Sequence, residues 1–195
     1  MLKVGITGGI GSGKTTVCKI FEQLGIPIYY ADDRAKKLMV EDPQLVKEIK
    51  VLLGEEAYTR EGQLDRAFIA NIVFNNPDKL AQLNALVHPA VARDGATWQK
   101  TQTEVPYTLK EAALLYEAGS YQSLDRMICV VAPEEMRIQR VMERDQVDRA
   151  AVIARINKQW PQAQKARLSD FLIYNDGTQS LIRQVVRIHQ RLKAW

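Results

Sequence analysis

Apolar residues follow two alternating patterns along the chain. Short apolar runs are typical of buried strands, and segments with apolar residues three and four positions apart are typical of amphipathic helices. The runs predict strands at Leu2–Thr7, Ile26–Tyr30, Tyr107–Leu109, Met127–Val131 and Phe171–Tyr174. The helical spacing is clearest over Thr15–Leu24 and Thr178–Leu192. Strands that alternate with helices predict an α/β fold, with a parallel sheet covered by helices on both faces.

Residues 32–102 lack this alternation of strands and helices and are predicted to be mostly helical. Turn residues predict breaks at Asp42-Pro43, Gly54, Gly62, Asn76-Pro77 and His88-Pro89. The longest apolar run of the whole chain, Met127–Ala132, is far shorter than the about 20 residues of a membrane-spanning helix. Glycines at positions 8 and 9 also interrupt the first apolar stretch, which excludes a signal-peptide core. We therefore expect no membrane partner.

Composition indicates one domain of 195 residues that can bury a sizeable core, because 46% of them are hydrophobic. The two cysteines, Cys18 and Cys129, are too few and too far apart for a zinc knuckle or a redox pair. A reducing cytoplasm is the expected location. Cys18 is expected to pack its helix against the sheet.

Positive charge is concentrated late in the chain. The formal net charge is +4, and the segment from Arg137 to Arg167 holds eight basic and three acidic residues. The segment balance is thus +5 and the rest of the chain sums to −1. A solvated helix face and a local anion site both explain such a run. Nucleic acid is not expected as a partner, because no arginine-rich arm or stacking motif accompanies the charge.

The segment between the first strand and the first helix carries the clearest chemistry. Gly8-Gly9-Ile10-Gly11-Ser12-Gly13-Lys14-Thr15 completes the motif G-x-x-x-x-G-K-[ST], a P-loop. Backbone N–H groups of such a loop point at phosphate oxygens, and the helix that follows adds its positive end. Lys14 is expected to reach the β- and γ-phosphates, and the Thr15 hydroxyl to ligate Mg²⁺. A dinucleotide motif is excluded because Lys14 stands where its last glycine would be. The sequence therefore predicts nucleoside triphosphate binding.

Three features favour a small-molecule kinase. The basic segment comes where small kinases carry a lid that excludes water. Asp32 and Asp33 stand just past the second strand, where a carboxylate can accept the proton of an attacking hydroxyl; a helix N-cap is the alternative for Asp32. No N-K-x-D guanine motif occurs, which argues against a GTPase. Glu111 ends the third strand, where either a second Mg²⁺-side carboxylate or an exposed surface acid is expected.

The stretch Thr7–Thr16, T-G-G-I-G-S-G-K-T-T, resembles the start of the dephospho-CoA kinase family. Further matches follow in the family's order: His88-Pro89, Leu114-Leu115-Tyr116-Glu117, Arg144-Asp145, Ala154-Arg155-Ile156, Gln159-Trp160-Pro161 and Asn175-Asp176-Gly177. The similarity covers essentially the whole chain. It implies a three-layer P-loop kinase fold and ATP-dependent phosphorylation of the ribose 3′-hydroxyl of dephospho-CoA, the last step of coenzyme A biosynthesis, with ATP and Mg²⁺.

The resemblance also implies roles for single residues. Asp32 matches the second aspartate of the family's D-A-D motif and would be the general base. The implied ATP site comprises Gly11, Ser12, Gly13, Lys14, Thr15, Thr16, Arg155, Asn175 and Asp176; Arg140 and Arg144 would be catalytic lid arginines; and Thr7 and His88 would lie on the substrate side. Two positions depart from the family: Tyr30 replaces the first aspartate, and Glu111-Ala112-Ala113 replaces D-x-P.

Within the one domain, three subregions are expected. The P-loop core would comprise residues 1–31, 106–136 and 168–195, a helical insertion holding the CoA-type substrate would span 32–105, and the basic lid 137–167. Two other functions stay open. One is a different small-molecule or nucleoside monophosphate kinase, and the other is a P-loop regulatory ATPase that needs no acceptor.

Overall fold

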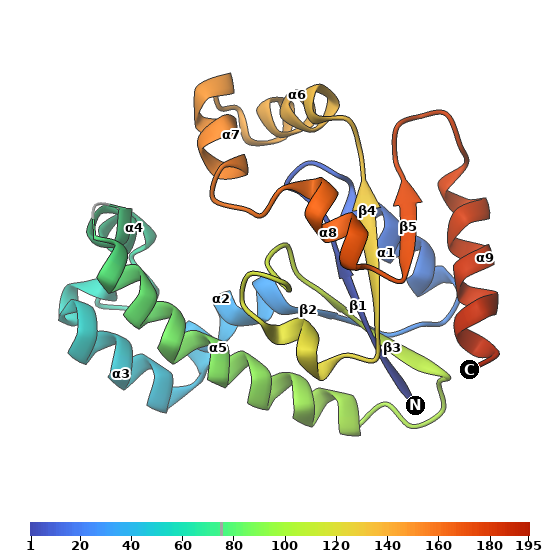
Figure 1. Ribbon diagram of the computed structural model, residues 1–195. Coiled ribbons are helices and arrows are strands. Elements are labelled where there is room, and N and C mark those ends of the chain that lie inside the picture. The colour runs from blue at the N-terminus through green and yellow to red at the C-terminus, as the bar shows by residue number, and fades with distance from the viewer. Residues whose placement is uncertain (75) are drawn as a thin grey trace. The chain divides into compact units, whose positions relative to one another are not determined.

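A parallel sheet of five strands runs through the residues that the computed structural model describes, 1–74 and 76–195 (Figure 1). The strand order is β2-β3-β1-β4-β5. The strands are β1 (Leu2–Thr7), β2 (Ile28–Tyr30), β3 (Tyr107–Glu111), β4 (Arg126–Val131) and β5 (Phe171–Tyr174). The register sets Ile6 beside Glu111 on one side and Ile128 on the other. The carboxyl ends of the parallel strands therefore share one edge, and the predicted α/β class is confirmed.

The chain divides into two compact units. The first, residues Met1–Tyr30 and Gln102–Trp195, contains the sheet, and the second, Ala31–Thr101, is helical. The helices of the first unit are α1 (Lys14–Gln23), the 3-10 turn η2 (Ser120–Ser123), α6 (Glu134–Asp145), α7 (Arg149–Ile156), α8 (Gln162–Leu168) and α9 (Leu181–Lys193). The helical unit is made of α2 (Ala31–Glu41), α3 (Pro43–Leu53), the turn η1 (Glu55–Ala57), α4 (Arg66–Phe74) and α5 (Pro77–Lys100).

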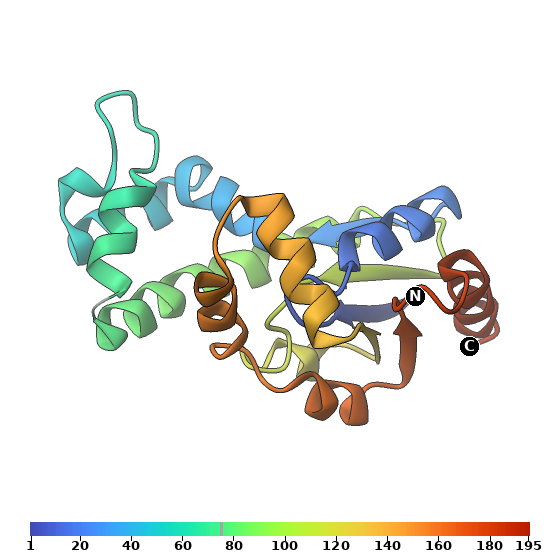
Figure 2. The same cartoon turned by 90° about the horizontal axis from the view of Figure 1, so that it is seen from above.

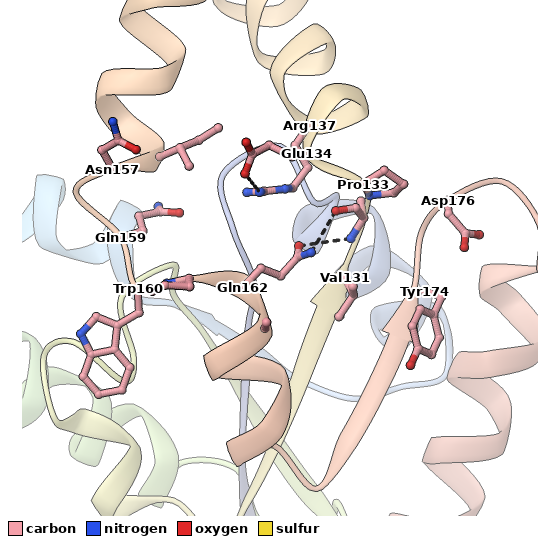
Figure 3. Close-up of a pocket in the computed structure, with 14 residues that line it drawn as sticks. Val131, Pro133, Glu134, Arg137, Asn157, Gln159, Trp160, Gln162, Tyr174 and Asp176 are labelled. Carbon is pink, nitrogen blue, oxygen red and sulfur yellow. Dashed lines mark hydrogen bonds and ion pairs between the residues drawn. The ribbon is translucent and has the colours of Figure 1, made fainter.

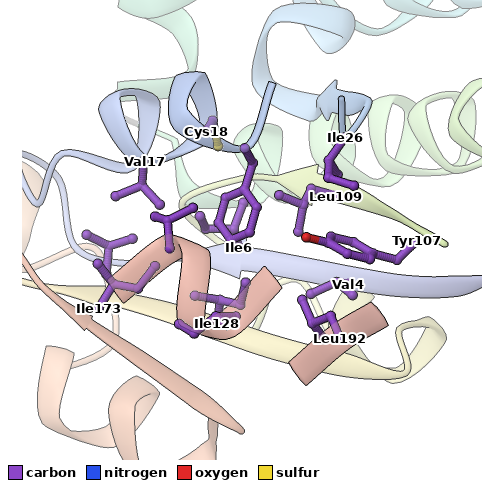
Figure 4. Close-up of a cluster of buried hydrophobic side chains, with 14 residues drawn as sticks. Val4, Ile6, Val17, Cys18, Ile26, Tyr107, Leu109, Ile128, Ile173 and Leu192 are labelled. Atoms are coloured by element: carbon purple, nitrogen blue, oxygen red, sulfur yellow. The ribbon is translucent and has the colours of Figure 1, made fainter. Parts of the chain in front are cut away.

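Side chains that alternate along the strands separate the two faces of the sheet. Val4 and Ile6 point into a core closed by α1 and α9 (Figure 4), and Cys18 of α1 is fully buried in this core, as predicted. Gly5, between them, faces the opposite side, where an added Cβ would collide with the side chains of Met127 and Leu124. Helix α8 packs on β4 there, so that α1 and α8 lie on opposite sides of the sheet (Figure 2). These are the three layers expected for the core.

The helical unit is organised around its longest helix, α5, which packs against α2, α3 and α4. Arg34 of α2 donates to both carboxylate oxygens of Asp94 on α5, at 2.9 and 2.6 Å. Such a two-pronged pair fixes geometry as well as charge. Among the helices formed by residues 1–74 and 76–195, none is long and apolar enough to cross a membrane.

The break predicted at His88-Pro89 is wrong, because α5 continues through Pro89. A proline inside a helix costs about 3 kcal/mol, since it removes a backbone hydrogen bond and its ring crowds the preceding turn. Buried Leu83, Val87 and Val91 lie at helical spacing on both sides of it. Their packing stabilises the helix across the proline, a tertiary effect that local sequence does not reveal.

Candidate active site

The P-loop joins β1 to α1 in the tight conformation that its glycines allow. Ser12 donates its backbone N–H to the carbonyl of Gly9 at 3.0 Å, and the Lys14 ammonium donates to the carbonyl of Gly8 at 3.1 Å. Gly11 and Gly13 have φ angles of 77° and 92°, a left-handed region that disfavours residues with a Cβ. The loop therefore curls so that Lys14, at the amino end of α1, contacts the first residue of the loop.

Two side chains from distant parts of the chain contact the loop. Asn175, just past β5, donates its Nδ2 to the carbonyl of Ser12 at 2.8 Å, and a Cβ on Gly13 would collide with this amide. Arg140 of α6 approaches the carbonyls of Gly11 at 3.5 Å and Asn175 at 3.2 Å. The structure therefore brings Arg140 and Asn175 to the P-loop, beside Gly11, Ser12 and Gly13.

The loop has features that fit a bound phosphate. The hydroxyl of Ser12 is buried and has no hydrogen-bond partner among the described residues. The first turn of α1 contains no acidic residue, so nothing there opposes an anion at the positive end of the helix. Thr15 and Thr16 lie exposed in that turn. A phosphate would meet backbone N–H groups, a lysine and hydroxyl groups at this place.

Glu111 is buried at the end of β3, so it is not an exposed surface acid. Burial, and next the Glu111 carboxylate, raise the pKa of the Cys18 thiol, whereas Lys14 opposes this effect. Glu111 and Lys14 therefore both act on Cys18 from the carboxyl edge of the sheet.

Tyr30, at the other departure from the family pattern, donates its hydroxyl to Glu22 at 3.0 Å. Burial and this bond raise the pKa of Tyr30.

Two predicted residues belong to the helical unit. Asp32 is exposed in the first turn of α2, which begins at Ala31, and so does not precede the helix as an N-cap would. A carboxylate in a first turn is favoured by the helix dipole. His88 is exposed on α5. Thr7 belongs to the other unit, where it is fully buried and donates its hydroxyl to the carbonyl of Ala113 at 3.1 Å.

Two further arginines of the predicted lid, Arg144 and Arg155, meet at one acid. Arg144 and Arg155 each lie 2.7 Å from the carboxylate of Asp145, from α6 and α7 respectively. These two hydrogen-bonded guanidinium groups, Arg144 first, lower the pKa of Asp145 to about 2. Asp176 accepts from the backbone and hydroxyl of Thr178, at 2.9 and 2.7 Å. Of Arg140, Arg144 and Arg155, it is Arg140 that has a described contact to the P-loop in this conformation.

A pocket of about 770 Å³ opens beside the loop, between the start of α6, the end of α7 and the start of α8 (Figure 3). Arg137 lies in it with a side chain only 5% exposed, 3.2 Å from Glu134, and burial lowers its pKa. Gln159 accepts the backbone N–H of Ile10 at 2.9 Å. Arg137 and Gln159 were not among the residues predicted from the sequence to neighbour the P-loop. The spacing of Arg137, Arg140 and Arg144, which puts them along one side of a helix, was the available signal for Arg137.

Oxygen ligands for a metal are few. Within the described part of the chain, no group of three or more His, Cys, Asp or Glu residues could hold a metal ion. Mg²⁺ commonly takes one or two protein oxygens and completes its shell with phosphates and waters. The Thr15 hydroxyl and the Glu111 carboxylate are hard oxygen donors of that kind, so the residues present fit a metal that arrives with a nucleotide.

Comparison with known proteins decides the family. The family model of dephospho-CoA kinase matches residues 2–180. The chain belongs to the dephospho-CoA kinase family. A dephospho-CoA kinase from Chlorobaculum tepidum is 40% identical over 198 residues, covering 98% of this chain and 95% of that protein. One from Bacteroides fragilis is 34% identical over 187 residues, covering 96% and 91%. The predicted family and its kinase class are confirmed.

Solved structures agree with this assignment. A protein from Thermus thermophilus has a TM-score of 0.85 at 32% identity, covering 97% of this chain and 96% of that chain. A dephospho-CoA kinase from Campylobacter jejuni has a TM-score of 0.73 at 25% identity, covering 98% and 97%. A shikimate kinase from Bacteroides thetaiotaomicron, at 13% identity and a TM-score of 0.54, covers 100% and 99% and shares the fold. The P-loop kinase fold is thereby confirmed.

Proposed function

We propose that this chain transfers the γ-phosphoryl group of ATP to the ribose 3′-hydroxyl of dephospho-CoA, giving coenzyme A and ADP. The observation that carries the proposal is the P-loop, with its left-handed glycines and Arg140 and Asn175 against it, in a member of the dephospho-CoA kinase family. The product, coenzyme A, and the place of the reaction as the last step of coenzyme A biosynthesis follow from that family. The two buried, unoxidised cysteines suit a reducing cytoplasm.

On the donor side, the chain supplies positive charge and N–H groups to the phosphates. Lys14 would leave the carbonyl of Gly8 and reach the β- and γ-phosphates, because a phosphate is a stronger partner for an ammonium than a neutral carbonyl. The N–H groups of Gly11–Thr16 would surround the β-phosphate. Asn175 and Asp176 would border the adenine. Each contact stabilises the negative charge that moves during the transfer.

Thr15 and Glu111 would hold Mg²⁺, directly or through water. When bound, Mg²⁺ would neutralise negative charge on the phosphate groups of the nucleotide. Glu111 is buried beside Ile6 of β1, at the edge of the sheet where the P-loop begins.

On the acceptor side, Asp32 would orient the 3′-hydroxyl and accept its proton. Its exposed position in a first helical turn leaves the carboxylate accessible to a substrate. The helical unit would hold the CoA-type substrate, and His88 would be one of the residues that contact this substrate. Thr7, in the other unit, would also belong to the substrate side of the site. Residues 137–167 would close as a lid, and Arg140, Arg144 and Arg155 would contact the phosphates. Arg144 and Arg155 must exchange Asp145 for phosphate to do so.

The proposal is tested by ADP release from ATP and Mg²⁺, with and without dephospho-CoA, using adenosine and AMP as control acceptors. Strong stimulation by dephospho-CoA alone is expected. Stimulation by AMP or adenosine would indicate another small-molecule kinase, and slow turnover without any acceptor effect would indicate a regulatory ATPase.

A matched pair of variants links this activity to the P-loop. Lys14→Ala should nearly abolish the transfer. Lys19→Ala, which removes an exposed lysine of the same helix, should leave it unchanged. Normal turnover by the Lys14 variant would contradict the phosphate-binding role of the loop.

A further inference from the structure

A lysine of the basic segment has no exposed surface at all. Lys165 of α8 places its ammonium 2.6 Å from Oε1 of Glu117 and donates to the carbonyl of Ala113 at 2.8 Å. Its side chain is 0% exposed and that of Glu117 is 15% exposed. Burying a charge is costly unless the charge is paired and hydrogen-bonded. A solvated basic helix face is one of the two explanations given for this segment, but it does not account for a lysine whose side chain is fully buried.

The carbonyl that Lys165 binds lies at a junction near the P-loop. Ala113 follows Glu111 by two residues, and its carbonyl also accepts the hydroxyl of Thr7 at 3.1 Å. Thr7 is the last residue of β1, and the P-loop begins at the next residue. Lys165 and Thr7 therefore hold one carbonyl from two sides and fix the segment after Glu111 against the strand that leads into the P-loop.

The partner of Lys165 fastens a second segment. Oε1 of Glu117 also accepts the backbone N–H of Trp160 at 2.8 Å, and its Oε2 is buried without a hydrogen-bond partner among the described residues. The Trp160 ring stacks on Tyr116, with centroids 6.2 Å apart and planes 8° from parallel. Trp160 stands between α7 and α8, next to Gln159, which binds the P-loop backbone. The buried pair thus also fixes the chain where it returns from α7.

We propose that Lys165 is a positioning residue for phosphoryl transfer. Acting through the carbonyl of Ala113 and through Glu117, it fixes Glu111 relative to the P-loop and holds the chain at Trp160 while α7 moves. The proposal rests on the proposed function, which gives Glu111 its place on the Mg²⁺ side. It follows that the Mg²⁺ concentration needed for half-maximal activity depends on a lysine that is proposed to contact neither the metal nor the nucleotide.

The double variant Lys165→Met/Glu117→Gln tests this proposal. It removes the buried ammonium and its carboxylate partner together, which proteins tolerate better than the loss of one partner, and glutamine keeps an oxygen for the Trp160 N–H. The matched control is Lys193→Met, an exposed lysine of α9. We expect the double variant to keep its dissociation constant for ATP at saturating Mg²⁺, measured by calorimetry. Its kcat should fall by about 10²-fold, the cost of a small misplacement of reacting groups, and the Mg²⁺ concentration for half-maximal activity should rise several-fold. The control should match the wild type in all three.

A second variant covers the case in which the double variant does not fold. Thr7→Val removes the other donor to the Ala113 carbonyl without changing a buried charge, and it should raise the Mg²⁺ requirement in the same direction. A folded variant with lower thermal stability and an unchanged Mg²⁺ requirement would show a merely structural network and overturn the proposal. Failure of dephospho-CoA to stimulate the wild-type protein would instead refute the proposed function, and this assignment with it.

Discussion

Replacing Gly13 by alanine tests how tightly Asn175 holds the P-loop. Gly13 adopts φ 92° at the start of α1, and an added Cβ would collide with Nδ2 of Asn175, the group that donates to Ser12. Gly25, shortly after the end of the same helix, has φ 78° and nothing within 4 Å of an added Cβ. Gly25→Ala is therefore a matched control that carries the backbone strain without the collision.

The expected magnitudes follow from these two environments. A left-handed conformation costs an alanine about 1–2 kcal/mol, which is the whole expected loss of unfolding free energy for Gly25→Ala. Gly13→Ala should cost about 1 kcal/mol more, because Asn175 must move away and lose its hydrogen bond to the carbonyl of Ser12. Urea denaturation of both variants measures the difference. Calorimetry should also show weaker ATP binding for Gly13→Ala alone.

A double-mutant cycle isolates the contact. In the Gly13→Ala background, Asn175→Ala should cost less than in the wild type, because the hydrogen bond is already broken, and the coupling should be about 1 kcal/mol. If Gly13→Ala proves no more destabilising than Gly25→Ala, or if the cycle shows no coupling, then Asn175 does not hold the loop as argued.

Three further predictions concern the residues proposed for catalysis and the lid. Asp32→Asn should lower kcat by about 10²–10⁴-fold, the usual contribution of a general base, with ATP binding kept; equal losses in both, by kinetics and calorimetry, would contradict that role. Arg140→Met should weaken ATP binding more than Arg144→Met does, because Arg140 contacts the loop in the resting conformation; equal dissociation constants would contradict this. The pKa of Asp145 is about 2 in the folded protein against an ordinary 3.8. Its ion pairs therefore stabilise the fold above about pH 4, and this contribution disappears as the pH falls towards 2. Asp145→Asn lacks that contribution, so the gap in melting temperature between the two proteins should close over that range; a constant gap would refute the assignment.

The P-loop and the sheet were predictable from sequence because their determinants are local. The run Phe171–Tyr174 is the observed β5, and β1 begins at Leu2 and ends at Thr7 as predicted. In the P-loop, the motif itself requires the left-handed glycines that the structure shows at positions 11 and 13. The predicted second strand started two residues early, at Ile26, since strand ends depend on pairing with a neighbour and β2 pairs with β3 only from Ile28.

The partners of the charged residues were not predictable in the same way. The sequence alone does not distinguish a basic residue that is solvated from one that is buried. Lys165 pairs with Glu117, 48 positions earlier, and only the packing of α8 on β4 brings the two together. The sequence showed that positive charge is concentrated after β4. It could not show that one of these charges is inside the protein.

The three arginines of α6 show why that distinction matters for function. Arg137 is buried against Gly9 and held by Glu134, so it cannot leave without exposing a tightly packed loop. Arg144, by contrast, is 63% exposed in its pair with Asp145. Exposed ion pairs contribute only about 0–1 kcal/mol, whereas a phosphate offers a guanidinium two strong, parallel hydrogen bonds. We therefore expect Arg144 to exchange Asp145 for phosphate when ATP binds, and Arg137 to keep its place against the loop.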